Sequence, residues 1–77
     1  MKILEMIVYY DDKEIKTTRE EDLELIESDF NDLIYHKYVF KSNWVKRVVE
    51  RTNYNGTRTI TFTLDNRCKY KFLISSK

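Results

Sequence analysis

In residues 57–64, Thr-Arg-Thr-Ile-Thr-Phe-Thr-Leu, polar and apolar side chains alternate from Thr59 to Leu64. A period of two is typical of a β-strand with one buried face and one open face. The apolar members are predicted to face the core: Ile60, Phe62 and Leu64. The polar members are predicted to lie on the open face: Thr59, Thr61 and Thr63.

The hairpin before this strand is predicted from Asn55-Gly56, the strongest short signal of a two-residue type I′ turn. Such a turn pairs a strand over residues 44–52 with 57–64 and places Val49 opposite Phe62. By that parity the open face receives three side chains of the earlier strand: Trp44, Lys46 and Val48. The same parity puts the arginines on the helix side, where we expect them to pair with helix acids: Arg47, Arg51 and Arg58.

The hairpin after this strand is predicted to have a three-residue loop, 65–67. With that loop Phe62 lies opposite Tyr70, and the apolar side chains of both strands stay on one face. The following strand then adds three residues to the open face: Lys69, Lys71 and Leu73. Cys68 falls on the core side, where an unpaired thiol behaves as a small buried apolar group.

An amphipathic helix is predicted from residue 18 to about residue 35. Thr18 and Glu21 match the capping box, in which each side chain satisfies a backbone N–H of the first turn. The apolar residues that follow recur at helical spacing and form one face: Leu23, Ile26, Phe30, Leu33 and Ile34.

The N-terminal segment 3–10 is apolar on both faces, which is typical of a central strand, with Ile7 and Tyr9 on the open face. Residues 14–17 could return as a short hairpin strand after a turn at 11–13, and a further short strand is predicted over 38–41. The chain, 1–77, is therefore expected to form one α+β domain of order β(β)αβββ. One helix packs on one face of a four- or five-stranded antiparallel sheet.

Charge is divided along the chain. Residues 1–36 hold eleven acidic and four basic residues, a net charge of −7, and residues 37–77 hold ten basic and two acidic residues, a net charge of +8. This segregation predicts a charged macromolecular partner. Our leading hypothesis is that an acidic helix face acts as a nucleic-acid mimic and binds a basic surface on a nucleic-acid-handling protein, as an inhibitor or regulator. The face consists of Glu20, Glu24, Leu25 and Glu27.

Two alternatives stay open. The basic, partly aromatic sheet face could bind nucleic acid directly through stacking and phosphate contacts: Tyr9, Trp44, Lys46, Lys69 and Lys71. The open sheet face could instead pack on that of a second copy, giving a homodimer. Both charged surfaces also have a more common explanation that involves no partner. Acidic residues on a helix are most often simply solvated, and lysines on edge strands discourage aggregation.

Several functional classes find no support in the sequence. The single His36 and single Cys68 cannot build a usual four-ligand zinc site, and a lone glycine cannot build a phosphate-binding loop. No recognisable nucleophile motif surrounds any serine, and no apolar stretch is long enough to span a membrane. We therefore expect a non-enzymatic interaction protein without cofactor or metal. The absence of Ala, Pro and Gln beside abundant Lys, Ile, Tyr and Asn indicates a low-GC bacterium, phage or plasmid. We expect a cytoplasmic protein of phage or mobile-element type, which lies in the host cytoplasm if it is phage-encoded.

Overall fold

The computed structural model describes the backbone of residues 2–19 and 23–75, and the side chains of residues 2–18 and 26–75. Along the chain the elements are β1 (Ile3–Tyr10), β2 (Lys13–Arg19), α1 (Leu23–Ile34), η2 (Tyr35–Val39), β3 (Val45–Thr52), β4 (Arg58–Leu64) and β5 (Cys68–Ile74). Here η2 is a single wide turn of π-helix that continues α1.

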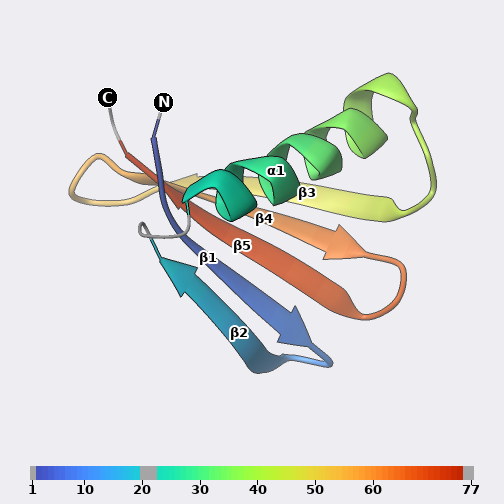
Figure 1. The fold of residues 1–77 in the computed structure, drawn as a ribbon, viewed down its shortest axis with the longest axis horizontal. Helices are drawn as coiled ribbons and strands as arrows, with labels where there is room; N and C mark the ends of the chain where they lie inside the picture. Colours follow the sequence, from blue (N-terminus) through green and yellow to red (C-terminus); the bar gives the residue numbers. More distant parts are fainter. Residues whose placement is uncertain (1, 20–22, 76–77) are drawn as a thin grey trace.

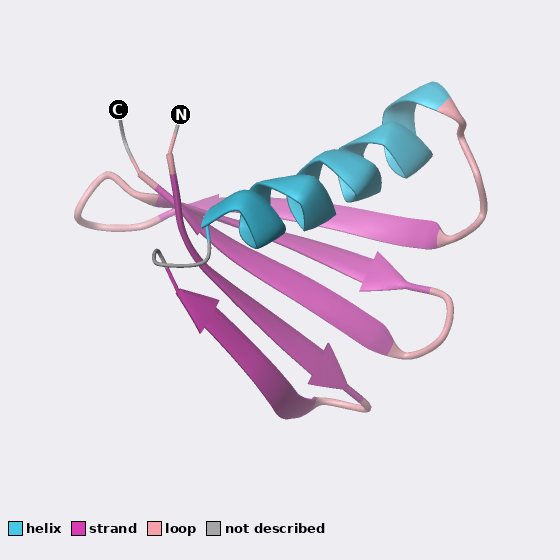
Figure 2. Ribbon diagram, in the orientation of Figure 1, coloured by secondary structure: helices cyan, strands magenta, loops and turns pink. Residues whose placement is uncertain are grey.

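The five strands form one antiparallel sheet in the order β2-β1-β5-β4-β3. The first and last strands therefore pair at the centre, and α1 crosses one face on the way from the edge strand β2 to the edge strand β3 (Figures 1 and 2). The predicted α+β class is confirmed, with order ββαβββ. The strand predicted over residues 14–17 exists and is longer than expected.

The first hairpin corrects the prediction of the helix start. Asp11 and Asp12 both adopt positive φ, 52° and 67°, which is the conformation of a type I′ two-residue turn. Pairing then continues through the whole of β2, and Thr18 lies opposite Met6 with only 4% of its surface exposed. The predicted capping box is wrong because Thr18 is a buried strand residue, and Glu21 lies outside the described residues.

The core lies between α1 and the sheet and is centred on three phenylalanine rings. Phe30 of α1 meets Phe62 and Phe72 edge to face, with centroids 5.8 and 5.0 Å apart, and Phe62 meets Phe72 at 5.7 Å. Such geometry adds to the stabilisation from apolar burial. Ile26 is fully buried beside them, so the predicted burial of Ile26, Phe30 and Phe62 is confirmed. The predicted pairing of Phe62 with Tyr70 is also observed.

The register of β3 differs from the prediction by one residue. The turn after β3 has three residues rather than two, because the Asn53 N–H donates to the Thr57 carbonyl (2.8 Å) and the Gly56 N–H donates to the Asn53 carbonyl (3.1 Å). Asn55 does not adopt the positive φ that a type I′ turn requires; only Gly56 does, at 84°. As a result Val48, not Val49, lies opposite Phe62.

This shift reverses the faces of most of β3. Arg47 and Arg51 lie on the open face with Val49, contrary to the prediction, while Val48 and Trp44 pack toward the core. A bulge between Val45 and Arg47 restores the parity at the start of the strand, where Val45 is buried as predicted. The remaining arginine, Arg58, stays on the helix side, and within the described side chains it pairs with Glu50 of β3 at 2.8 Å rather than with a helix acid.

Residues 38–41 do not form the predicted strand. The helix continues through η2, where the Phe40 N–H donates to the Tyr35 carbonyl at 2.9 Å, and the chain then reverses at Lys41, with φ of 52°. Aromatic and β-branched residues favour strands on propensity. Here the edge-to-face contact of Tyr35 with Phe40, with ring centroids 4.7 Å apart, favours the continued turn.

Replacing Gly56 by valine is expected to destabilise the protein by about 1–3 kcal/mol, because a β-branched residue is strained at a φ of 84°. Thermal unfolding followed by circular dichroism measures the loss. Arg67→Gly is the matched control, since Arg67 occupies the third position of the other three-residue loop, with φ of 71°. That variant should melt at or above the wild-type temperature. Equal melting of Gly56→Val and wild type would contradict the observed turn.

Candidate nucleic-acid interface

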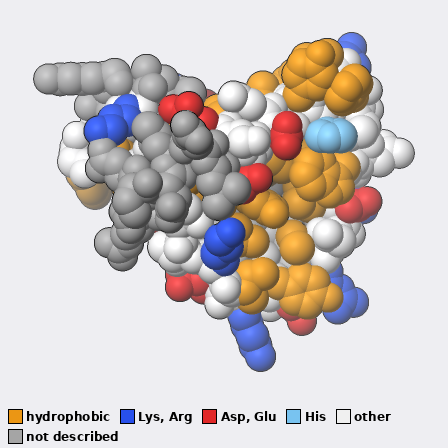
Figure 3. All heavy atoms as spheres, viewed as in Figure 1, with side chains coloured by type: hydrophobic (Ala, Val, Ile, Leu, Met, Phe, Trp, Pro, Cys, Tyr) orange, Lys and Arg blue, Asp and Glu red, His pale blue; other side chains and the backbone are white. Residues whose placement is uncertain are grey.

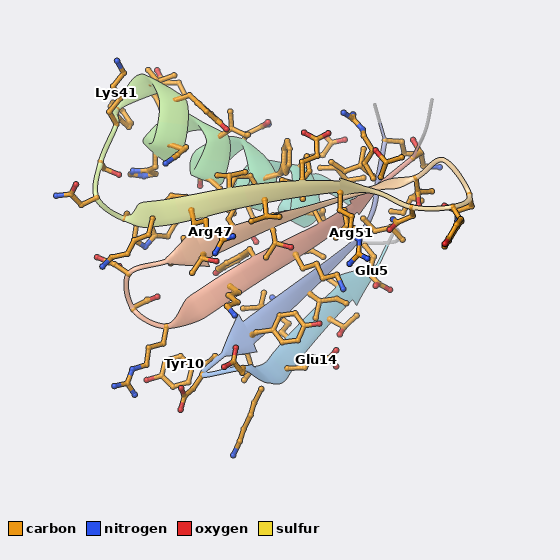
Figure 4. All side chains as sticks on the ribbon, turned by 180° about the vertical axis from the view of Figure 1, so that it is seen from behind. Glu5, Tyr10, Glu14, Lys41, Arg47 and Arg51 are labelled. Carbon is orange, nitrogen blue, oxygen red and sulfur yellow. The ribbon has the colours of Figure 1, made fainter. Side chains whose placement is uncertain are left out.

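The sheet face turned away from α1 carries side chains in three rows, because residues paired across neighbouring strands share a face. The first row runs across the sheet from β3 to β2: Arg47, Thr63, Lys69, Tyr9 and Glu14. The second row is Val49, Thr61, Lys71, Ile7 and Thr17. The third row contains Arg51, Thr59, Leu73 and Glu5. Figure 4 views this face and labels both arginines and both glutamates.

A trough follows β4 because its side chains are short and those of its neighbours are long. The floor consists of three threonines, all half-buried: Thr59, Thr61 and Thr63. Arginines of β3 form one wall, and lysines of β5 form the other. A hollow of about 410 Å³ lies here, lined by Arg51, Lys69, Lys71 and Tyr9 among others. We call these three threonines, with Arg47, Arg51, Lys69 and Lys71, the threonine trough.

The positive charge of the threonine trough is mostly uncompensated. Within the described part of the chain, Arg47, Arg51 and Lys71 make no ion pair. The Lys69 Nζ lies 2.9 Å from the Asp12 Oδ1, but the Asp12 side chain is 80% exposed. An exposed pair of this kind contributes little and is easily exchanged for another anion.

The floor of the trough offers hydroxyl groups. The Asn53 side-chain amide donates to the Thr57 Oγ1 at 3.1 Å and to the Thr59 Oγ1 at 3.0 Å. Because the Thr59 Oγ1 accepts a hydrogen bond from Asn53, the Thr59 O–H is left to donate a hydrogen bond to another group. A floor of hydroxyls flanked by four cations is suited to an extended anion that carries many oxygen atoms.

The described acidic residues of the same face come from the β1 and β2 side of the sheet, and one of them, Asp12, also lines the hollow beside Lys69. Glu5 belongs to β1, Glu14 to β2 and Asp12 to the turn between them (Figure 4). The open face is thus basic over β3, β4 and β5 and acidic over β1 and β2.

The predicted nucleic-acid-binding residues are divided by the structure. Tyr9, Lys69 and Lys71 come together at the trough. Trp44 does not join them, because it packs on the core and on the His36 ring at 4.8 Å. Lys46 is exposed at the bulge of the edge strand, outside the trough.

Comparison with protein-family models, curated proteins and solved structures gives no match to this chain. The function of the trough must therefore be argued from its own chemistry. Neither described helix is long and apolar enough to cross a membrane. Nor do His, Cys, Asp and Glu side chains in the described ranges gather in threes where a metal ion could sit.

The acidic helix face is only partly described. Glu20 lies outside the described residues, and Glu24 and Leu25 lie in α1 but their side chains fall outside the described part. Glu27 is exposed, as that hypothesis requires. The predicted burial of Cys68 is partly met, since the thiol is half-buried at the margin of the core.

Asp29 on the same helix has a perturbed acidity. Burial raises its pKa, the positive charge of Lys16 opposes that rise, and the negative charge of Asp32 adds to it. A carboxyl whose pKa is higher in the folded than in the unfolded protein destabilises the fold when it is ionised. This penalty is complete above the folded pKa and disappears as the pH falls to the ordinary aspartate value.

Replacing Asp29 by asparagine is therefore expected to raise the melting temperature slightly near pH 7, because the ionised carboxyl is removed from its half-buried position. The gain should shrink as the pH is lowered through the folded pKa of Asp29 and should vanish near the ordinary value. Glu27→Gln is the control, because Glu27 is exposed on the same helix and is not among the causes of the shift. A gain for Asp29→Asn that is independent of pH between 3 and 7 would contradict the assigned cause.

Proposed function

We propose that this protein is a binding protein without turnover that holds a single-stranded nucleic acid in the threonine trough. The observation that carries the proposal is the position of three cations without ion-pair partners in the described part of the chain. Arg51 and Lys71 line a hollow floored by threonine hydroxyls, and Arg47 lies on the same face beside Thr63. Phosphate contacts from Lys and Arg supply most of the affinity in sequence-independent binding.

The dimensions of the trough favour one strand over a duplex. Its walls, β3 and β5, are two strand spacings apart, or about 10 Å. From Arg47 to Arg51 the trough is about 13 Å long. Proteins read a duplex by inserting a helix or a β-ribbon into its groove, whereas a recessed surface accepts a single extended backbone. Tyr9, at one end of the trough, provides a ring on which a base can stack.

Face-to-face dimerisation through the open sheet face is disfavoured by the position of Lys71. This lysine occupies the middle row of the central strand, β5. Every two-fold axis that centres one sheet on another therefore brings Lys71 against Lys71 of the second copy. Like charges facing each other across an interface cost several kcal/mol.

The acidic helix face stays a prediction, because Glu27 is its only member with a described side chain. A variant with Glu20, Glu24 and Glu27 all replaced by lysine separates the two hypotheses. It should bind nucleic acid at least as well as wild type if the trough is the binding site. It should lose a basic protein partner if the helix face is the binding site.

Fluorescence anisotropy with labelled fifteen-nucleotide oligothymidylate and oligouridylate tests the proposal at low salt. We expect saturable binding of both single strands and weaker binding of a duplex of equal length. Unchanged anisotropy of both single strands at high protein concentration would refute it. Tighter binding of the duplex would refute the assignment to a single strand.

A further inference from the structure

A second surface of the protein exposes several large apolar side chains that are not part of the buried core. Tyr35, Tyr38, Val39 and Phe40 are 50–62% exposed, at and just after η2. Figure 3 shows apolar side chains gathered at this end of α1, beside the only histidine. We call these four residues the aromatic platform. A cluster of this kind on a soluble protein usually marks a binding surface.

The aromatic platform is held in a fixed conformation. The Phe40 N–H donates to the Tyr35 carbonyl at 2.9 Å, and the Ser42 N–H donates to the His36 carbonyl at 3.0 Å. The His36 ring packs on Phe40 and on Trp44, which joins the platform to the core. Lys41 takes a positive φ, which is unfavourable for a residue other than glycine. A π-helical turn with such strain is frequently a functional feature.

A basic hollow adjoins the platform. It has a volume of about 980 Å³, and its lining includes Tyr38 with three lysines, Lys37, Lys41 and Lys46, against one carboxylate, Asp65. Lysines around an exposed ring match a ligand that carries both phosphates and planar bases. The charge of this hollow therefore complements a nucleic acid rather than a basic or neutral protein surface.

The hollow and the threonine trough meet at the start of β3. Val45 and Lys46 line the hollow, and Arg47, the next residue, lies on the wall of the trough. Consecutive side chains of a strand point to different sides, and the bulge between Val45 and Arg47 sets Arg47 on the open face. Figure 4 shows Lys41 beyond the Arg47 end of the sheet.

We infer that a nucleic-acid strand bound in the threonine trough continues around the edge of β3 to the aromatic platform, where unpaired bases stack on Tyr38 and Phe40. This inference rests on the proposed function. The phosphates of the nucleic-acid strand would pair with Lys41 and Lys46 between the trough and the platform. A strand long enough to reach both sites binds the second site as an intramolecular step, so affinity should rise steeply with length.

The test compares oligothymidylates of four and fifteen nucleotides by anisotropy. Replacing Tyr38 and Phe40 together by alanine should weaken binding of the long strand at least about fivefold and leave binding of the short strand unchanged. Tyr54→Ala is the matched control, because Tyr54 is fully exposed at the hairpin before β4. Lys46→Glu is a second variant that tests the path and leaves the rings intact. It should also weaken only the long strand.

Two results would overturn the inference in distinguishable ways. The first result is that the Tyr38 and Phe40 double variant and Lys46→Glu both bind the long strand as wild type does, while Arg51→Ala weakens binding of strands of both lengths. This result would refute the inference about the platform and leave the proposed function standing. The platform would then be a surface for a partner of another class, such as an acidic protein. The second result is that Arg51→Ala leaves binding of strands of both lengths unchanged. This result would refute the proposed function and the inference together.

Discussion

Replacing Phe62 by alanine is expected to lower the free energy of unfolding by about 3–5 kcal/mol, the largest stability loss we expect from one substitution in this protein. Phe62 is fully buried and meets both Phe30 and Phe72 edge to face. Its removal leaves a cavity between α1 and the sheet that neither ring can fill. Small domains have about 5–15 kcal/mol in total, so the variant should lose a large part of its stability and unfold at a lower urea concentration than wild type.

Urea denaturation followed by circular dichroism measures this loss. Thr61→Ala is the matched control, because Thr61 neighbours Phe62 on β4 and points to the open face. A surface substitution of that kind usually changes stability by less than about 0.5 kcal/mol. A Phe62→Ala variant as stable as Thr61→Ala would contradict the assigned core.

Reversing charge at Arg51 and Lys71 together is expected to reduce single-strand affinity more than a hundredfold. The two side chains lie on opposite walls of the threonine trough, and neither makes an ion pair within the described residues. Replacing both by glutamate removes two phosphate contacts and adds two repulsive charges to the site. The fold should be retained, because Arg51 is exposed and Lys71 is half-exposed.

The matched control for this prediction is Lys13→Glu with Lys16→Glu. Both lysines are exposed on β2, at the opposite edge of the sheet from β3. This control changes the net charge by the same amount, so it separates contact with the trough from attraction to the whole molecule. Equal loss of affinity in the two double variants would show that the trough is not the binding site.

Much of the fold could be predicted because local pattern and tertiary environment agree there. In β4 the alternation of threonine with Ile60, Phe62 and Leu64 admits only one buried face. The three-residue loop before β5 was the only one that kept both apolar rows together, and the observed pairs confirm it. The helical face with Ile26 and Phe30 packs as its period predicts.

The register of β3 could not be predicted in the same way. Its sequence contains valines at both 48 and 49, so neither face is excluded by polarity. The choice depended on the loop, and Asn55-Gly56 fits both a two-residue turn and the observed three-residue turn with Gly56 in the last position. One residue of difference moved Arg47 and Arg51 to the open face, and the basic wall of the trough was missed for that reason.

Two local motifs were overridden by tertiary contacts. Thr18 has the residue type of a helix cap, but pairing of β2 with β1 continues through it. Residues 38–41 have strand-like side chains, but the contact between Tyr35 and Phe40 extends the helix instead. A short sequence motif carries no information about either contact, because each depends on residues outside the motif.

The salt dependence of single-strand binding tests the threonine trough most directly, because it counts the phosphates that the protein neutralises. The logarithm of affinity for the oligothymidylate should fall linearly with the logarithm of salt concentration, with a slope near −0.7 per phosphate. Four cations in the trough predict a slope of about −2 to −3 for a strand that fills it, and Arg51→Ala should reduce its magnitude by about 0.7. A slope near zero, or a slope that Arg51→Ala leaves unchanged, would contradict binding in the trough.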